Sequence, residues 1–305
     1  MTAAFVHLHL HTEYSLADGL VRVAPLMNTV YEAGMPAVAL TDYNNLFALV
    51  KFYRAAIARG IKPIIGVDTV VTGVHPTDPL NRIVLLCQNE TGYRNLTRLV
   101  TRAHLDGQRG GVPVVHYDWL TEASFGLIVL SGGRYGDVGR ALLTANNALA
   151  KDHLAFWREH FPDRYYLELQ RTGRDDEERY LCAAVELAAV TNTPVVATND
   201  VRFLKREDFE THEARVCIRE GRILHDSRRP RRFSDQQYLR TPEEMAELFK
   251  DLPEALANTL EIAKRCTVSL TFGKNVLPQF PTPAGMSADD YFRLQAQEGL
   301  KRRLQ

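Results

Sequence analysis

The sequence predicts an α/β fold in which helices surround a barrel of parallel strands and a helical extension follows. Strand-like and helix-like segments alternate through the first two thirds of the chain, the pattern of successive strand–helix units. Seven strand candidates favour a closed or nearly closed barrel, and 305 residues suit one barrel with an extension. A doubly wound open sheet is the alternative, although no strand candidate is followed by the glycine-rich motif of a dinucleotide or P-loop site.

The strand candidates are short apolar or alternating runs with turn residues on both sides. They are Phe5 to Leu10, Pro36 to Leu40, Pro63 to Val71, Ile83 to Cys87, Gly126 to Leu130, Arg164 to Leu169, and Pro194 to Ala197. Because helical segments separate most of them, we expect the strands to run parallel and to end at one shared rim.

The helix candidates show apolar residues at helical spacing. Between the strands they are Ala24 to Ala33, Leu46 to Ala58, Tyr93 to Leu105, Val138 to Leu149, and Glu177 to Ala189. After the last strand candidate the pattern becomes helical throughout, with Phe209 to Arg219, Pro242 to Phe249, and Pro253 to Arg265. Prolines near the starts of the last two helices agree with this reading, because proline fits the first turn.

A proline-rich passage divides the chain near its end. Residues 277–286 predict an extended linker, so that residues 1–276 form the barrel with its trailing helices. Ser287 and Asp290 then make an S-x-x-D start signal for an amphipathic helix. We expect residues 287–305 to be the first helix of a following region, truncated in this chain. The alternative is a carboxyl-terminal helix docked on the barrel.

Composition excludes several classes of protein. There are 37 basic and 37 acidic residues, so no net charge draws the whole molecule to a polyanion. No window is apolar enough to span a membrane and no export signal is visible, so we expect a cytoplasmic protein. The four cysteines form no C-x-x-C pair, which argues against a zinc ribbon or a redox dithiol.

The first strand candidate carries three histidines at alternate positions. His7, His9 and His11 are expected to share one face, while the intervening apolar residues face the helices. In a barrel the histidine face would point inward, towards the rim where active sites form. Three imidazoles crowded together inside a barrel favour a metal site over a purely structural role.

Carboxylates follow other strands at the same predicted rim. The run Pro63 to Gly66 leads into Asp68, the run Pro194 to Ala197 leads into Asp200, and Asp18 lies in the loop after the first strand. With His9 and His11 they form a nitrogen and oxygen set suited to Zn²⁺, Mn²⁺ or Fe. Asp42 also follows a strand, but we interpret it as a turn or cap residue.

Two arginines argue against a complete metal cluster. Arg202 lies two residues beyond Asp200, and Arg82 starts the fourth strand candidate, so cations can take the space of metal ions. A guanidinium neutralises carboxylates, but it cannot lower the pKa of a bound water to near 7.

A basic run could contact nucleic acid. Arg228, Arg229, Arg231 and Arg232 place four guanidinium groups within five residues. Because acidic residues are equally dense nearby, a solvated loop or a salt-bridged tether is the favoured reading.

Long stretches of the sequence resemble one known family. The runs FVHLHLHTEYSLADG, MPAVALTDYNNLFALVKFY, GIKPIIGVD, LLCQNETGYRNLTRLV, GLIVLSGGRYGDVGRAL and PVVATNDVRFL are similar to the amino-terminal PHP (polymerase and histidinol phosphatase) domain of bacterial DNA polymerase III alpha subunits. The resemblance covers essentially the whole chain, and motifs of this length and order are specific. It implies a distorted (β/α)₇ barrel.

The resemblance also implies a set of metal-ligand positions. Metal-binding members carry a trinuclear site, for which His9, His11, Asp18 and Asp200 match the family ligands. Five positions depart from the pattern. Tyr43, Arg82 and Arg202 stand where histidines are usual, Asp68 stands for a glutamate, and Gly133 stands for a cysteine.

These departures imply a degenerate domain with no catalytic residue of its own and without metal-dependent 3′–5′ exonuclease activity. The resemblance implies a scaffold role in DNA replication, with the epsilon exonuclease subunit and the remainder of the alpha subunit as partners. DNA would be contacted only through the full polymerase, and no membrane is involved. We expect no cofactor, apart from at most a residual Zn²⁺, Mn²⁺ or Mg²⁺. The alternative is a residual metal-dependent phosphoesterase or exonuclease.

Overall fold

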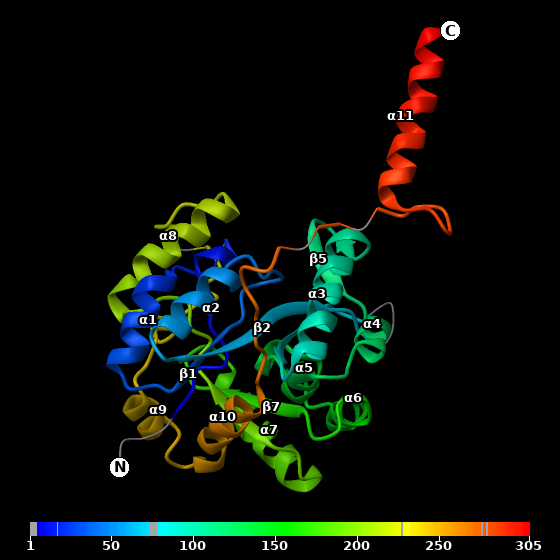
Figure 1. Ribbon diagram of the computed structural model, residues 1–305. Coiled ribbons are helices and arrows are strands. Elements are labelled where there is room, and N and C mark those ends of the chain that lie inside the picture. The colour runs from blue at the N-terminus through cyan, green and yellow to red at the C-terminus, as the bar shows by residue number, and fades with distance from the viewer. Residues whose placement is uncertain (1–4, 17, 74–77, 227, 276, 279) are drawn as a thin grey trace. The chain divides into compact units, whose positions relative to one another are not determined.

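The computed structural model describes residues 5–16, 18–73, 78–226, 228–275, 277–278 and 280–305 (Figure 1). Contacts divide the chain into two units, Met1–Ser269 and Leu270–Gln305. No helix among the described residues is long and apolar enough to cross a membrane. The candidate functional residues all lie in the first unit.

Seven chain segments make the barrel of the first unit. Six are strands, namely β1 (Ala37–Leu40), β2 (Lys62–Val71), β3 (Asn81–Cys87), β6 (Leu127–Leu130), β7 (Tyr165–Gln170) and β8 (Val195–Thr198). The seventh is the segment Phe5–Thr12, which lies between β1 and the residues after β8. The amide of His11 donates to the carbonyl of Val201 (2.9 Å), and the amide of Thr41 donates to the carbonyl of Leu10 (3.0 Å). The predicted α/β barrel is therefore confirmed.

The sheet is mixed rather than fully parallel. β1 pairs in parallel with β2, and β6, β7 and β8 are parallel to one another. β3 is antiparallel to both of its neighbours, β2 and β6. The expectation of a parallel sheet is wrong at β3, because the connection at residues 72–80 is too short for the helical crossover that a parallel neighbour needs.

A bulge interrupts the first segment. The amides of Ala39 and Thr41, two residues apart, donate to carbonyls of His7 and Leu10, three residues apart. One extra residue therefore lies on the first segment, and an insertion of this kind moves later side chains to the opposite face. Leu8 accordingly belongs to the central apolar cluster. The expected common face of the histidines is thus wrong for His7.

Eleven α-helices are found in the described part of the chain. They are α1 (Val23–Glu32), α2 (Leu49–Ala58), α3 (Glu90–Leu105), α4 (Tyr117–Glu122), α5 (Asp137–Leu143), α6 (Asn147–His160), α7 (Glu177–Thr191), α8 (Phe209–Glu220), α9 (Pro242–Leu248), α10 (Pro253–Arg265) and α11 (Ala288–Leu304). A small hairpin of β4 (Gln108–Arg109) and β5 (Val112–Val115) was not predicted.

The structure has two helices, α5 and α6, where the sequence predicted one. The run from Val138 to Leu149 is broken because Ala145 has a positive φ of 57°. Asn146 then starts α6, since its side chain accepts a hydrogen bond from the amide of Leu149 (3.1 Å).

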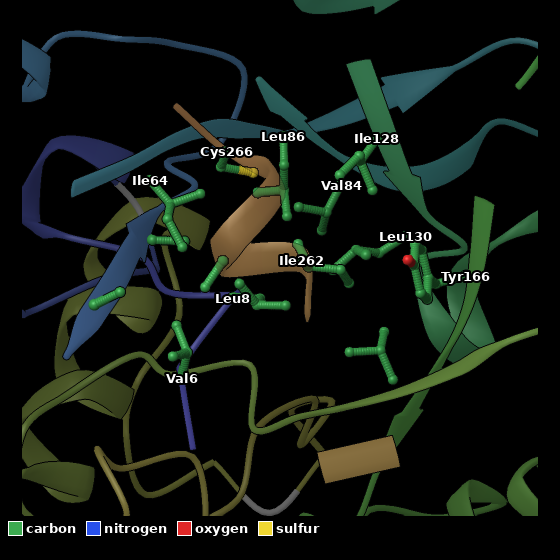
Figure 2. Close-up of a cluster of buried hydrophobic side chains, with 14 residues drawn as sticks. Val6, Leu8, Ile64, Val84, Leu86, Ile128, Leu130, Tyr166, Ile262 and Cys266 are labelled. Carbon is green, nitrogen blue, oxygen red and sulfur yellow. The ribbon is translucent and has the colours of Figure 1, made fainter. Parts of the chain in front are cut away.

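Helix α10 closes the amino end of the barrel. Figure 2 shows Ile262 of this helix and Cys266, the residue after it, among apolar side chains from the barrel strands. The side chain of Asn258 donates to the carbonyl of Val195 at the start of β8 (2.8 Å). Because one end is sealed by apolar packing, polar chemistry is confined to the opposite, carboxyl end.

The second unit contains helix α11. Helix α11 begins directly after Ser287, whose hydroxyl accepts a hydrogen bond from the amide of Asp290 (3.1 Å). Its apolar side chains, which include Phe292 and Leu300, are exposed.

Candidate functional site

The structure brings the five sequence-predicted ligand positions into one cluster at the carboxyl end of the barrel. Asp68 is near the middle of the long strand β2, and Asp200 follows β8. The Nε2 atom of His9 lies 3.2 Å from Asp68 Oδ2 and 3.5 Å from Asp200 Oδ1. His11 lies 3.1 Å from Asp68 through Nε2 and 3.7 Å from Asp18 through Nδ1.

Three of these residues could together hold one ion. The Nε2 atoms of His9 and His11 are 3.2 Å apart, and both lie within 3.2 Å of Asp68 Oδ2. Among the described residues, this is the group of histidine, cysteine and carboxylate side chains that comes close enough to ligate a metal. Two imidazoles and a carboxylate would suit Zn²⁺ or Mn²⁺.

Guanidinium groups already occupy the carboxylates of the cluster. Arg82 contacts both oxygens of Asp68 through Nε and Nη2, with Nε 3.2 Å from Oδ1. Arg202, almost fully buried, bridges the other two carboxylates: Nη1 lies 2.8 Å from Asp18 Oδ2, and Nη2 lies 2.6 Å from Asp200 Oδ1. The donor set therefore does not fit a polynuclear metal centre, and even a single ion would have to share Asp68 with Arg82.

The charges in the cluster shift the pKa values of its members. Burial opposes ionisation of all three aspartates. The neighbouring positive groups together outweigh burial and lower all three pKa values, with the largest lowering effect from Arg202 on Asp18 and Asp200 and from Arg82 on Asp68. The three carboxylates are therefore ionised at neutral pH.

The two cluster histidines behave differently. Burial would lower the pKa of His9, but the carboxylates of Glu168, Asp200 and Asp68 together outweigh it and raise the pKa to about 10. Burial, with help from Arg202, lowers the pKa of His11. In the arrangement described, His9 is an imidazolium that donates to carboxylates, while His11 is neutral.

Tyr43 and Gly133 are two further positions at which the resemblance implies a replaced ligand, and Tyr43 lines the cavity at this end of the barrel. Tyr43 lies next to Asp68 through a parallel bridge, and the guanidinium of Arg82 stacks over its ring, 4.9 Å from the centroid. Gly133 starts a 3₁₀ turn after β6 with a positive φ of 56°. Neither offers a nitrogen or sulfur ligand.

Several important residues were not predicted from the sequence. Glu168 on β7 accepts from His9 Nδ1 (2.7 Å) and from the hydroxyl of Thr198 (2.6 Å). Arg174 is a third arginine of the cluster, with Nη1 3.0 Å from Asp200 Oδ2. Glu168 could have been predicted as a site residue, because it is a charged residue at an inward position of a mostly apolar strand.

Asp42 and His7 lie outside the cluster. The carboxylate of Asp42 accepts from the hydroxyls of Thr12 (2.7 Å) and Ser15 (2.7 Å), so it fixes the loop that follows the first segment. His7 Nε2 lies 2.8 Å from the carbonyl oxygen of Arg240, away from the other histidines.

Most of the basic run is paired with acidic side chains. Arg228 contacts Asp226, Arg229 contacts Glu213, and Arg232 lies 3.4 Å from Glu220. Arg231 is exposed. The pairs with residues on α8 fit a salt-bridged tether, and Arg232 also reaches the mouth of the barrel.

A polar cavity of about 530 Å³ opens above the cluster. Its lining includes Asp18, Arg82, Arg174, Asp200 and Arg202, together with Tyr43, Tyr135 and Phe233. Asp18 and Asp200 thus face the cavity with their carboxylates held by arginines, whereas His9, His11 and Asp68 are buried and are not part of its lining.

Comparisons with known proteins place this arrangement in context. A family model described as the PHP domain matches residues 7–172. The chain is 56% identical over its full length to DNA polymerase III subunit alpha of Pseudomonas aeruginosa, and 55% identical over 98% of its length to that of Escherichia coli K12. It spans 26% of the length of each of these relatives.

Solved structures with similar folds are more distant. One is described as a putative metal-dependent phosphoesterase from Bifidobacterium adolescentis, with 14% identity and a TM-score of 0.41 over 65% of this chain and 87% of that chain. Another is an amidohydrolase from Chromobacterium violaceum, with 17% identity and a TM-score of 0.43 over 65% of this chain and 88% of that chain.

Proposed function

Because the chain belongs to the PHP domain family, we propose that it is the PHP part of a replicative DNA polymerase alpha subunit, serving as a catalytically silent scaffold. Its identity to DNA polymerase III alpha subunits along the whole chain supports the assignment to this polymerase. The proposed partners are the rest of the alpha subunit and the epsilon proofreading exonuclease.

One observation carries the proposal of a silent site. Arg82 and Arg202 neutralise the carboxylates that a metal-dependent enzyme would use to hold its ions. A guanidinium supplies positive charge and hydrogen bonds, but it has no open coordination position for water. Without an activated water, a phosphodiester in the cavity would meet no nucleophile.

We propose that nucleotidyl transfer is carried out by parts of the polymerase outside this chain. We assign no role in nucleotidyl transfer to Asp18, Asp68 or Asp200, because each is tied to a guanidinium rather than free to hold Mg²⁺. Zero net charge also favours protein partners over a DNA contact made by this region alone.

The scaffold role is tested by binding. The chain is mixed with purified epsilon subunit and analysed by size-exclusion chromatography and calorimetry, with the full alpha subunit as the positive control. Co-elution of epsilon with both proteins is expected. Binding to the full subunit without measurable binding to this chain contradicts the scaffold role.

The silent site is tested by restoring ligands. Tyr43→His, Arg82→His, Gly133→Cys and Arg202→His are combined, and bound metal is measured after purification without chelators. Uptake of Mn²⁺ or Zn²⁺ is expected in the variant. The unmodified chain serves as one control, and the variant with His9→Ala and His11→Ala added serves as a second that should lose the metal.

A residual metal-dependent phosphoesterase is the second candidate, and the group of His9, His11 and Asp68 favours it. Stoichiometric metal in the unmodified chain, together with cleavage of 3′-ended DNA or of phosphoesters, supports this candidate and overturns the silent site.

A further inference from the structure

A second cavity, of about 400 Å³, lies between helices α5 and α6 and the start of β3. Its lining comes from residues 78–81 and 137–156, and none of the lining residues belongs to the cluster inside the barrel. A volume of this size is ordinary for a small-molecule site. We call this feature the α5–α6 cavity, after the two helices that form most of its lining (Figure 1).

A buried carboxylate forms part of the wall of the α5–α6 cavity. Asp137 is the first residue of α5 and is only 4% exposed. Its Oδ2 atom accepts from the hydroxyl of Tyr117 and from Trp157 Nε1 (2.8 Å), and its Oδ1 atom accepts from the amide of Val138 (2.7 Å). These donors are neutral. Among the described residues only His153 comes within ion-pair distance, with Nδ1 3.8 Å from Oδ2. The charge of Asp137 is therefore stabilised by dipoles and lacks a closely paired cation.

The rest of the polar lining adds negative charge and an unused acceptor. Asp78 and Asp152 also line the cavity, so the lining holds three carboxylates and one guanidinium, that of Arg140. Asn81 is 3% exposed, and its Oδ1 atom is buried without a hydrogen-bond partner in the described part of the chain. A ligand that carries positive charge and donates hydrogen bonds would complement both the carboxylates and this oxygen.

Apolar side chains complete the lining. Leu149 and Phe156 come from α6, and Ala141 comes from α5. The ring of Phe156 is held against that of Tyr117, with centroids 4.8 Å apart. These surfaces suit a hydrocarbon chain or a ring, and they offer nothing to a strongly hydrated inorganic ion. The described residues around this cavity also include no group of histidine, cysteine and carboxylate side chains close enough to ligate a metal.

We propose that the α5–α6 cavity binds a small organic cation, an amine or amidine carried on an apolar body. The cationic group lies beside Asp137 and donates to Asn81, while the apolar body packs against Phe156 and Leu149. Asp152 at the exposed side adds attraction at longer range. This inference does not depend on the scaffold role, because it uses a different part of the molecule.

Benzamidine, a planar cation on a benzene ring, is the probe, and benzamide is its neutral counterpart. The complete 305-residue chain has two tryptophans, whose indole resonances are followed by ¹H–¹⁵N NMR. Trp157 bonds the Asp137 carboxylate, whereas Trp119 lies outside the cavity lining. We expect benzamidine to shift the Trp157 resonance saturably, with a Kd of about 1 mM or tighter, and to leave that of Trp119 unmoved. Benzamide should bind at least about tenfold more weakly.

Charge-removing variants locate the site. Asp137→Asn keeps the shape of the side chain and should weaken benzamidine binding about tenfold, and the exposed Asp152→Asn should weaken it about threefold. Glu159→Gln is the matched control, because Glu159 is an exposed carboxylate on the same helix as Asp152 but outside the lining. The thermal midpoint of each variant separates loss of charge from loss of fold. If Asp137→Asn does not fold, the comparison of Asp152→Asn with Glu159→Gln decides.

Three results would overturn the proposal. The first is a Trp157 resonance that shows no saturable shift up to about 10 mM benzamidine. The second is equal binding of benzamide and benzamidine, which would exclude a cation as the ligand. The third is an equal loss of affinity in Asp152→Asn and Glu159→Gln, which would show that the charge of the whole surface attracts the probe. Epsilon binding is not measured in any of these titrations, so the scaffold role stands or falls separately.

Discussion

Replacing Arg202 with methionine tests whether guanidinium groups hold the candidate site together. Arg202 is only 1% exposed, and its guanidinium contacts Asp18 and Asp200, both of which are buried. Methionine fills a similar volume but leaves two carboxylates without their main partner. We expect the free energy of unfolding at pH 7 to fall by about 3–5 kcal/mol, as when one partner of a buried ion pair is removed.

A matched surface variant gives the comparison. Arg206 bonds Asp235 with a distance of 2.6 Å, but the two side chains are 61% and 39% exposed. Arg206→Met should therefore cost less than about 1 kcal/mol, because water screens this pair. Both variants lose an arginine, so the difference between their free energies of unfolding measures the effect of burial.

Urea unfolding at several pH values provides the assay. The pKa of Asp200 is lowered in the fold, so its ion pair stabilises the protein above pH ~4, and this contribution is lost as the pH falls further. The cost of Arg202→Met should accordingly shrink between pH 7 and pH 4, as the unpaired carboxylates of the variant take up protons.

Added Mn²⁺ should restore part of the stability of Arg202→Met and leave the wild type unchanged. A cost of less than about 1 kcal/mol at pH 7, or a cost independent of pH, would refute the claim that Arg202 neutralises a buried carboxylate pair.

Three further changes test other parts of the fold. Gly132→Ala should destabilise the protein by several kcal/mol more than Gly34→Ala. Both glycines have a positive φ, but only at Gly132 would an added Cβ overlap the backbone of β3. Thermal unfolding of the two variants measures the difference. Asp137→Ala should cost roughly 2–4 kcal/mol and alter the fluorescence of Trp157, whose indole loses its 2.8 Å acceptor. Burial lowers the pKa of His7 to about 4, so unfolding titrations should show stability falling by about 3 kcal/mol between pH 6.5 and 4, with a smaller fall in His7→Gln.

The strands could be predicted because their signals are local. Short apolar runs between turn residues located all seven barrel segments, from Phe5–Thr12 to Val195–Thr198. The break between α5 and α6 could not be predicted, because an alanine in the sequence does not indicate the positive φ found at Ala145. The short connection before β3 indicated that this strand runs antiparallel. The alternation of strands and helices in the rest of the chain nevertheless favoured a parallel assignment.

The candidate site was predictable only in part. Strand ends can be located in the sequence without knowledge of side-chain packing. The positions of His9, His11 and Asp200 at the rim could therefore be predicted. The separation of His7 from them depends on a bulge, and a bulge is set by which amide meets which carbonyl across the strands. Arg174 lies in a loop, and its contact with Asp200 arises from tertiary packing alone.

Arginines and metal ions solve the same electrostatic problem with different consequences. Several carboxylates at one end of a barrel repel one another unless positive charge lies between them. An ion leaves when its concentration falls, whereas Arg82 on β3 and Arg202 after β8 are fixed by the backbone, so the barrel would fold without an ion. The same covalent attachment removes the exchangeable water that hydrolysis requires. A protein that gains stability in this way can keep the barrel and its outer surfaces for partner binding while the chemistry is carried out by another subunit.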